Sequence, residues 1–236
     1  MNCSCKLLPG KRVAGLPAGL QPRFLSGLPA ADLDAILSAA SHRKFPAPSV
    51  ILHEDDPAER IFLLTSGHGR HFVLRSDGRK VFLYWLTAGQ VFGGMAMLSG
   101  PSNYLASTEV LADSCALVWD KPTIRELVSR FPILLDNALS IAGTENFAWL
   151  MEAYISLSSD SAIGRIAHML ISLACGVGRK GPDGIEIRVG NEDLATAANV
   201  TPSTVSRALT RWQREGVVTK GRGKVFLRKP ELLVTR

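Results

Sequence analysis

The sequence predicts an α+β protein with two folded parts joined by a long helix. Short runs of alternating apolar and polar residues, separated by turns, occupy residues 42–121. A mostly apolar helical segment follows Pro132, and residues 191–227 combine two short helices with a hairpin. The chain has 236 residues, of which 46% are hydrophobic and 20% charged, which is typical of a soluble protein with room for two small domains.

The N-terminal part predicts a β-roll. Residues 1–27 are rich in Gly and Pro, so we expect a flexible arm there, and residues 29–40 have the pattern of a short amphipathic helix. The clearest strand signals are IFLLTSG (61–67), RHFVLRSDGRKVFLYWLTAG (70–89), with Asp77-Gly78 as its hairpin turn, and STEVLADSCALVWD (107–120). Several short strands at this spacing indicate a β-sandwich or a double-stranded jelly roll, which we place over residues 28–131.

A helix is expected over 123–131 and a longer one over 132–158. The second half of the long helix is apolar nearly all round, so it must be covered on several sides. One seam has the alternating spacing of four and three that is typical of coiled coils. Its residues are Leu135, Leu139, Ala142, Asn146, Trp149 and Ala153. Either the helix pairs with a second copy of itself, or the seam is ordinary core.

The stretch TPSTVSRALTRWQREG (201–216) predicts a short helix with both ends marked. Thr201 is a good N-cap, and Pro202 falls at the first helical position, where its missing N–H costs nothing. Gly216 follows the last turn, where a left-handed residue commonly closes a helix.

The two faces of this helix separate cleanly. Val205, Ala208, Leu209 and Trp212 form an apolar stripe that should pack inward. The opposite face has three arginines, three small hydroxyls and no acid, whereas a solvated face usually mixes both signs of charge. The residues of this outer face are Ser203, Ser206, Arg207, Thr210, Arg211 and Arg214.

The neighbouring segments complete a winged helix-turn-helix over residues 159–236. GNEDLATAANV (190–200) predicts a helix capped by Asn191, and only a short turn separates it from the next helix. VVTKGRGKVFL (217–227) predicts two short strands around a Gly-Arg-Gly turn, with Lys220, Arg222 and Lys224 at the tip. The second helix of such a pair enters the major groove of DNA, and a basic wing contacts phosphates.

The charge distribution favours the same interpretation. Residues 200–236 hold nine Lys/Arg and two Asp/Glu, a net charge of +7, while the whole chain has a net charge of +6. The basic character is therefore confined to the C-terminal part, as a phosphate-binding surface requires. A membrane surface would need a large apolar face opposite the charges, so membrane binding is not expected.

The sequence also indicates a cytoplasmic protein. It has no run of about 18 apolar residues and no apolar signal-peptide core near its start. Its four cysteines do not suggest a disulfide framework. We expect Cys175, near the end of a helix, to be a small buried hydrophobe.

From about residue 25 onward the chain resembles the Crp/Fnr family of bacterial transcription regulators. The resemblance rests on SVILHEDDPAERIFLLTSG (49–67), DGRKVFLYWLTAGQVFGGMAML (77–98), SAIGRIAHMLISLA (161–174) and the helix-turn-helix at 191–218. It implies a β-roll sensor domain, a dimerisation helix, a winged helix-turn-helix, double-stranded DNA as partner and, for an activator, contact with RNA polymerase.

The resemblance also implies which residues bind DNA. In the family the positions of Ser203, Ser206 and Arg207 contact bases, and many members have a glutamate where this chain has Ser203. Because a glutamate accepts a hydrogen bond from cytosine, its replacement should change the preferred half-site. The expected DNA-binding set is Thr201, Ser203, Thr204, Ser206, Arg207, Arg211, Lys220, Arg222 and Lys224.

The sensor domain is not expected to bind cAMP. Family members that bind cyclic nucleotides use a glutamate for the ribose and an arginine for the phosphate, and a buried phosphate suits a guanidinium. Gly94 occupies the glutamate position here, and Tyr104 and Leu105 occupy those of the arginine and the following serine. We expect an effector pocket that is apolar or filled by its own side chains. Its candidate residues are Gly93, Gly94, Met95, Tyr104, Leu105 and Trp149.

A metal cofactor is not favoured. An iron–sulfur cluster normally needs four thiolates, and Cys3, Cys5 and Cys115 are weak candidates because their spacing differs from that of the family. A histidine could bind haem, but no partner motif accompanies any of them. His68 and His71 have an odd spacing on a strand, which sends their side chains to opposite faces and weakens the alternative of a cupin-like metal-dependent enzyme fused to a DNA-binding module.

The sequence thus favours a homodimeric DNA-binding regulator that is not an enzyme. No nucleophile–base arrangement, P-loop or carboxylate pair is present. An effector other than cAMP would be sensed in the β-roll, and nothing in the sequence names that effector.

Overall fold

The computed structural model describes residues 16–182 and 184–234, apart from the side chains of Glu145 and Val234. The chain divides into two compact units. The first comprises the chain up to Leu74 together with Trp85–Ala148, and the second comprises Arg75–Tyr84 and Trp149–Arg236. Cys3 and Cys5, the N-terminal candidates for a cluster, lie outside the described residues.

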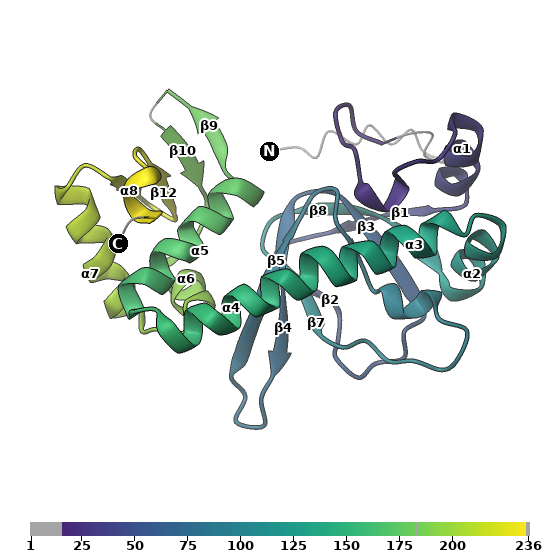
Figure 1. Ribbon diagram of the computed structural model, residues 1–236, viewed down its shortest axis with the longest axis horizontal. Coiled ribbons are helices and arrows are strands. Elements are labelled where there is room, and N and C mark those ends of the chain that lie inside the picture. The colour runs from purple at the N-terminus through teal and green to yellow at the C-terminus, as the bar shows by residue number, and fades with distance from the viewer. Residues whose placement is uncertain (1–15, 183, 235–236) are drawn as a thin grey trace. The chain divides into compact units, whose positions relative to one another are not determined.

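Two antiparallel four-stranded sheets form the β-roll (Figure 1). Their strand orders are β1-β8-β3-β6 and β2-β7-β4-β5. The strands are β1 (Ser41–Phe45), β2 (Ser49–Leu52), β3 (Arg60–Ser66), β4 (His68–Leu74), β5 (Lys80–Thr87), β6 (Val91–Phe92), β7 (Ser107–Val110) and β8 (Ser114–Asp120). The strands expected between residues 42 and 121 are therefore present.

Short helices cover the first sheet. They are the 3-10 helices η1 (Arg23–Leu25) and η2 (Gly94–Met97) and the α-helices α1 (Ala30–Ser38) and α2 (Lys121–Arg130). Trp119 of β8 is buried and donates its indole N–H to the carbonyl of Ile36, 2.9 Å away, which fixes α1 to the sheet. Asp120 caps α2 by accepting the backbone N–H of Thr123 at 3.0 Å. The two helices expected at 29–40 and 123–131 are confirmed.

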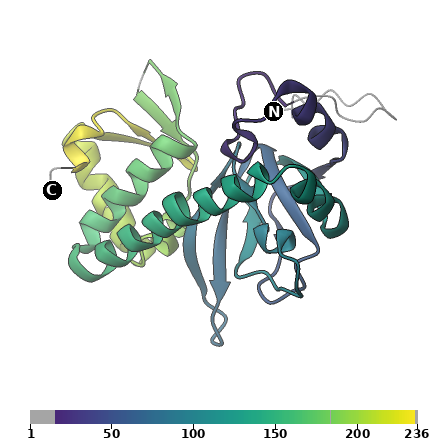
Figure 2. The ribbon, with the colours of Figure 1, turned by 45° about the vertical axis from the view of Figure 1, so that its right-hand side comes forward.

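The predicted hairpin turn at Asp77-Gly78 joins β4 to β5 (Figure 2). Gly78 has a φ of +81°, a conformation that L side chains rarely adopt, and Asp77 accepts the backbone N–H of Arg79 at 3.1 Å. The tip of the hairpin, Arg75–Tyr84, belongs to the second compact unit.

The long helix is present but is interrupted in its middle. It consists of α3 (Ile133–Ser140), a π-helical turn η3 (Ile141–Asn146) and α4 (Phe147–Ser159). Gly143 has no side chain to pack, and Thr144 donates its hydroxyl to the carbonyl of Ser140 at 2.6 Å. A residue of low helix propensity beside a hydroxyl that competes for a backbone carbonyl is a common cause of irregular helix turns.

The residues of the predicted seam differ in exposure. Leu139 is 61% exposed and Ala142 is exposed, whereas Leu135 packs on the core of the β-roll and Asn146, Trp149 and Ala153 are partly buried. The π turn shifts the angular position of every later residue, and a second apolar set, on α4, is exposed as well. These residues are Phe147, Leu150, Met151, Tyr154, Ile155 and Leu157.

The second unit contains α5 (Ala162–Gly176), α6 (Asn191–Ala197), α7 (Pro202–Arg214) and α8 (Glu231–Val234). Its sheet has the order β11-β12-β10-β9, formed by β9 (Arg179–Gly181), β10 (Gly184–Ile187), β11 (Val218–Gly221) and β12 (Lys224–Leu227). Among the described residues, no helix is long and apolar enough to cross a membrane.

The expectation that Cys175 is buried is wrong, because its side chain is exposed. Helix α5 buries Met169, Leu170 and Leu173 on one face. Cys175 lies two residues beyond Leu173 and therefore points to the opposite side of the helix.

Candidate nucleic-acid interface

Helix α7 begins as the sequence predicts. Thr201 has extended backbone angles, and its hydroxyl accepts the backbone N–H of Thr204 at 3.2 Å. The same hydroxyl lies 2.8 Å from the Ser203 hydroxyl and 2.9 Å from the Thr204 hydroxyl. The three predicted hydroxyl residues therefore form one bonded group at the start of the helix.

Helix α7 also ends as predicted. Gly216 has a φ of +70°, and its N–H donates to the carbonyl of Gln213 at 3.2 Å. The N–H of Val217 donates to the carbonyl of Trp212 at 2.9 Å. This pair of bonds is a Schellman motif, which requires a left-handed residue at the position of Gly216.

The separation of faces is confirmed. Val205, Ala208, Leu209 and Trp212 are each at most 1% exposed and anchor α7 in the core of the second unit. Because these four side chains are fixed inside, the outer face has a defined orientation. Ser203, Arg207, Arg211 and Arg214 are exposed, and Ser206 and Thr210 are partly exposed.

The helix before α7 differs from the prediction at its first residue. Asn191 does not cap α6 but is its first residue, and Gly190 is the N-cap, without a side-chain hydrogen bond. Gly190 has the extended backbone that an N-cap requires, with φ −83° and ψ 159°, so the helix begins one position earlier than a capping Asn191 would place it. Asn199, at φ +49°, closes α6 and turns the chain toward α7.

The outer face of α7 is hollowed. Its hollow has a volume of about 410 Å³ and is lined by Ser206, Arg207, Thr210, Arg211, Arg214 and Glu215. Glu215 forms an ion pair with Arg211 at 2.9 Å, one helical turn apart. Among the described residues, Arg207 and Arg214 form no ion pair, so both guanidinium groups can bind an anion or a base edge. Sequence reasoning placed Arg214 on this face without assigning it to the site.

The wing is the β11–β12 hairpin, and its three predicted cations have different surroundings. Lys220 donates from Nζ to the Thr210 hydroxyl at 2.9 Å, so its charge lies against α7. Arg222 is exposed at the turn. Lys224 donates from Nζ to Glu186 of β10 at 3.3 Å. Lys220 and Lys224 also line a second hollow of about 490 Å³, between the wing and the start of α6.

The arrangement of α7 and the wing suits recognition of a nucleic-acid duplex, which is a polyanion with a regular groove. A buried apolar stripe fixes the orientation of α7, and its exposed guanidinium groups can form paired hydrogen bonds to guanine. Lys220, whose partner is a neutral hydroxyl, can supply a point charge for a phosphate.

Only some of the residues predicted to line the effector pocket lie close to one another. Tyr104 is 7% exposed, and its hydroxyl donates to the carbonyl of Arg60 at 2.9 Å and accepts the Arg60 N–H at 3.0 Å. Burial raises the pKa of Tyr104. A Cβ on Gly93 would lie 2.8 Å from the same Arg60 carbonyl and 3.3 Å from the Tyr104 ring, so only glycine fits there. Gly94 is exposed, Leu105 is 74% exposed, and Met95 is partly buried on the core.

Trp149 has other neighbours, in the second unit. Its ring centroid lies 5.7 Å from that of Phe82 and 5.8 Å from that of Tyr84. Burial raises the pKa of Tyr84 to about 12. Trp149 of α4 thus packs against two aromatic rings of β5, and the contact covers part of the apolar surface of each ring.

The comparisons with known proteins agree with this architecture. The family model described as cyclic nucleotide-binding domain matches residues 42–131, and the one described as Crp-like helix-turn-helix domain matches residues 164–236. The chain belongs to the Crp/Fnr family of transcription regulators. Two curated relatives cover most of this Crp/Fnr regulator. The cyclic AMP receptor protein of Thermus thermophilus is 29% identical over 210 residues, covering 88% of this chain and 93% of the relative. The anaerobic regulatory protein of Bacillus subtilis is 26% identical over 219 residues, covering 88% and 89%.

Solved structures show the same fold. FixK2 from Bradyrhizobium japonicum has a TM-score of 0.70 at 23% identity, covering 82% of this chain and 95% of that chain. The regulator CLP of Xanthomonas campestris, described as c-di-GMP responsive, has a TM-score of 0.72 at 17% identity, covering 84% and 99%.

The cysteine and histidine candidates do not gather in the part of this Crp/Fnr regulator that the structure describes. No group of three or more His, Cys, Asp or Glu side chains that could hold a metal occurs among the described residues. Cys115 is buried within β8. His71 is buried with Nδ1 2.8 Å from the Thr108 hydroxyl, and burial lowers its pKa to about 3. His68, three residues earlier on the same strand, is only partly buried.

Proposed function

We propose that this Crp/Fnr regulator binds a two-fold palindromic DNA site as a homodimer, with α7 in the major groove and the wing on the flanking phosphates. The observation that carries the proposal is the outer face of α7, where Arg207 and Arg214 are exposed beside hydroxyl groups on a firmly anchored helix. Half-sites would lie about one helical turn of DNA apart.

The homodimer is supported by α4. Tyr154 is 70% exposed, Phe147 60% and Ile155 55%, and the apolar side chains Leu150, Met151 and Leu157 of the same helix are also exposed. Phe147, Leu150, Tyr154 and Leu157 follow one another at intervals of three, four and three residues, the spacing of a coiled-coil seam. A contiguous apolar stripe of this kind is unfavourable in water and favours pairing with the same stripe of a second copy.

The proposed regulator is controlled by an effector other than cAMP. At the two positions where the family's cyclic-nucleotide binders have charged groups, Gly94 has no side chain and the Tyr104 hydroxyl is already bonded to Arg60. Titration calorimetry with cAMP should give no saturable heat. Micromolar binding of cAMP would contradict this part of the proposal.

No enzymatic activity is proposed, because the relatives are transcription regulators and the cupin-like alternative has no metal-binding group among the described residues. As a DNA-binding regulator it would act in the cytoplasm and, if it is an activator, contact RNA polymerase.

Selection of duplexes from a random pool, followed by footprinting, tests the proposal directly. The expected result is a palindromic consensus, with two protected half-sites on successive turns of one DNA face. Recovery of duplexes without a shared motif would contradict the proposal.

A further inference from the structure

The wing sheet has an outer face that is separate from the recognition helix. Glu186 of β10 pairs with Phe226 of β12, and Phe226 pairs with Thr219 of β11. Directly paired residues share a face, and alternate residues along a strand share it too. Lys224 therefore lies on the same face as Phe226 and Glu186, while Val225 and Leu227 point into the core.

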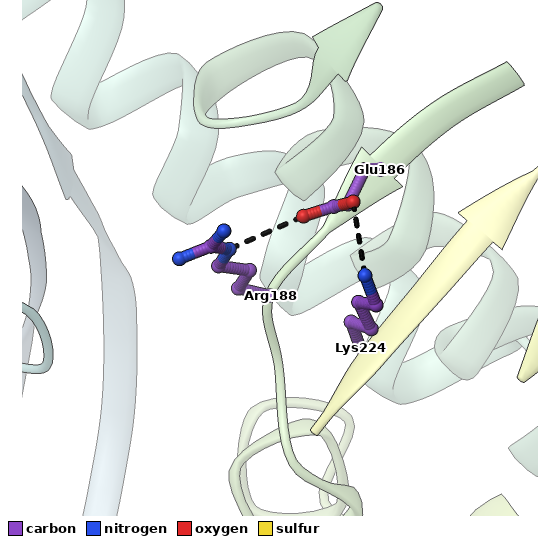
Figure 3. A network of polar contacts seen from close by, with 3 residues as sticks. All are labelled: Glu186, Arg188 and Lys224. Carbon is purple, nitrogen blue, oxygen red and sulfur yellow. Dashed lines mark hydrogen bonds and ion pairs between the residues drawn. The ribbon is translucent and has the colours of Figure 1, made fainter. Parts of the chain in front are cut away.

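Glu186 connects two cations on this face. Figure 3 shows its carboxylate between Lys224 and Arg188. Oε2 lies 3.3 Å from Nζ of Lys224, and Oε1 lies 3.2 Å from Nε of Arg188. The hydrogen bond from Arg188, followed by that from Lys224, lowers the pKa of Glu186, so the carboxylate is ionised at neutral pH.

The position of Lys224 is further fixed by its neighbours. Its ammonium lies 4.8 Å above the centre of the Phe226 ring. A Cβ on Gly221, the residue directly opposite Lys224, would come within 2.9 Å of Lys224 Cγ. The stem of Lys224 thus crosses the Gly221 backbone toward Glu186.

The other cations of the interface are bound differently. Lys220 pairs with Val225 and lies on the opposite face of the hairpin, where its partner is the neutral hydroxyl of Thr210. Arg222 forms no ion pair among the described residues. Lys220 and Arg222 can therefore bind a phosphate without breaking an ion pair. Lys224 and Arg188 must first give up their ion pairs with Glu186.

We propose that Glu186 holds Lys224 and Arg188 back from DNA phosphates and thereby limits the sequence-independent part of the affinity for DNA. This inference rests on the proposed function. A phosphate that approaches Lys224 must displace the carboxylate, and an unscreened carboxylate also repels the phosphate. The base-reading face of α7 makes no use of Glu186, so selectivity among sequences is unaffected.

The experiment compares the native full chain with Glu186→Gln and with Glu231→Gln. The control removes the same charge from α8, where Glu231 is exposed. Binding to the selected site and to a random duplex is measured by fluorescence anisotropy between 50 and 200 mM salt.

Glu186→Gln should bind both duplexes several-fold more tightly, by the same factor. The slope of its log affinity against log salt concentration should increase in magnitude by about one to two, since each added phosphate contact contributes about 0.9 to that slope. Glu231→Gln should retain the native slope. Equal slopes for Glu186→Gln and the native chain would overturn the inference, as would an equal change in Glu231→Gln.

A double-mutant cycle tests the role of Lys224 itself. Lys224→Ala should reduce the affinity less in the native chain, where Lys224 is held by Glu186, than in the Glu186→Gln chain, where it should abolish most of the gain. The same loss in both backgrounds would overturn the inference. Glu186→Asp keeps the charge and should keep the native salt slope, and thermal unfolding of each variant checks that the wing remains folded.

The outcome separates the two proposals. A native chain that binds without any sequence preference contradicts the proposed function and removes the basis of this inference. A native chain that selects its site while Glu186→Gln behaves identically contradicts this inference alone.

Discussion

The Nε of Arg165 donates to the backbone carbonyl of Ala198 across 2.9 Å, which joins the first turn of α5 to the end of α6. The same guanidinium donates to the carbonyl of Asp160 at 3.0 Å and to that of Asn199 at 3.3 Å. One side chain therefore satisfies carbonyls from the end of α4, the end of α6 and the turn before α7. Cations at helix C-termini are favourable because the last carbonyls have no partner within the helix.

Arg165→Ala should destabilise the second unit by about 1–3 kcal/mol, the usual cost of losing hydrogen bonds from a charged donor. It should also weaken binding to the selected DNA site, because the turn at Asn199, which leads into α7, loses its hydrogen bond from Arg165. Urea unfolding and anisotropy measure the two effects. Arg165→Lys can reach only one of the carbonyls and should be intermediate, whereas Lys229→Ala, which removes an exposed cation of the same unit, should leave stability unchanged. An Arg165→Ala chain as stable as the native one would contradict the prediction.

Arg207→Ala should relax the preference for one guanine in each half-site at a cost of about 1–3 kcal/mol on the selected duplex. The reason is that the Arg207 guanidinium is exposed on the outer face of α7 and no described acid pairs with it. The measurement is a binding competition between duplexes substituted at each position. An equal loss on every sequence, random DNA included, would assign Arg207 to the phosphates instead.

Tyr154→Glu should convert the proposed dimer to a monomer, because it places a charge in the middle of the exposed apolar stripe of α4. Sedimentation velocity at micromolar concentration reports the change. Leu105→Glu introduces the same charge at a residue that is 74% exposed outside α4, and it should remain dimeric. If Tyr154→Glu sediments as the native chain does, α4 is not the dimer interface.

His71 should make the protein less stable in acid. Its folded-state pKa is lowered to about 3, so between pH 6.5 and pH 3 the unfolded chain binds a proton that the folded chain does not. Stability is therefore retained above pH 6.5 and lost as the pH falls, by about 2 kcal/mol at pH 5. Urea unfolding of the native chain and of His71→Gln at pH 5 and pH 7 checks this expectation. The difference between the two pH values should shrink in the variant, and an identical difference would exclude His71 as its source.

Local signals explain why α7 could be predicted. Thr201, Pro202 and Gly216 act within one turn of their own positions, and the burial of Val205 and Trp212 follows from the period of the helix. The capping of α6 was predicted wrongly because Asn191 and Gly190 are both suitable caps, and the backbone angles decide between them.

Features that depend on distant residues could not be predicted. The exposed stripe of α4 depends on the π turn at Ile141–Asn146, which a periodic pattern does not reveal. The pair of Lys224 and Glu186 joins residues 38 positions apart on strands whose register is set by the whole sheet. The exposure of Cys175 follows from which face of α5 packs against α6, α7, α8 and β10.

The two faces of the wing hairpin have a consequence for the evolution of such regulators. Residues 220 and 225 lie toward the core and α7, while residues 224 and 226 lie on the other side. Under the proposals above, substitutions on the outer side change the overall affinity for DNA, and substitutions on α7 change the preferred bases. Because Lys224 is bound by Glu186 of β10 and not by a residue of α7, a lineage could adjust how many genomic sites it occupies without altering which sequence it prefers.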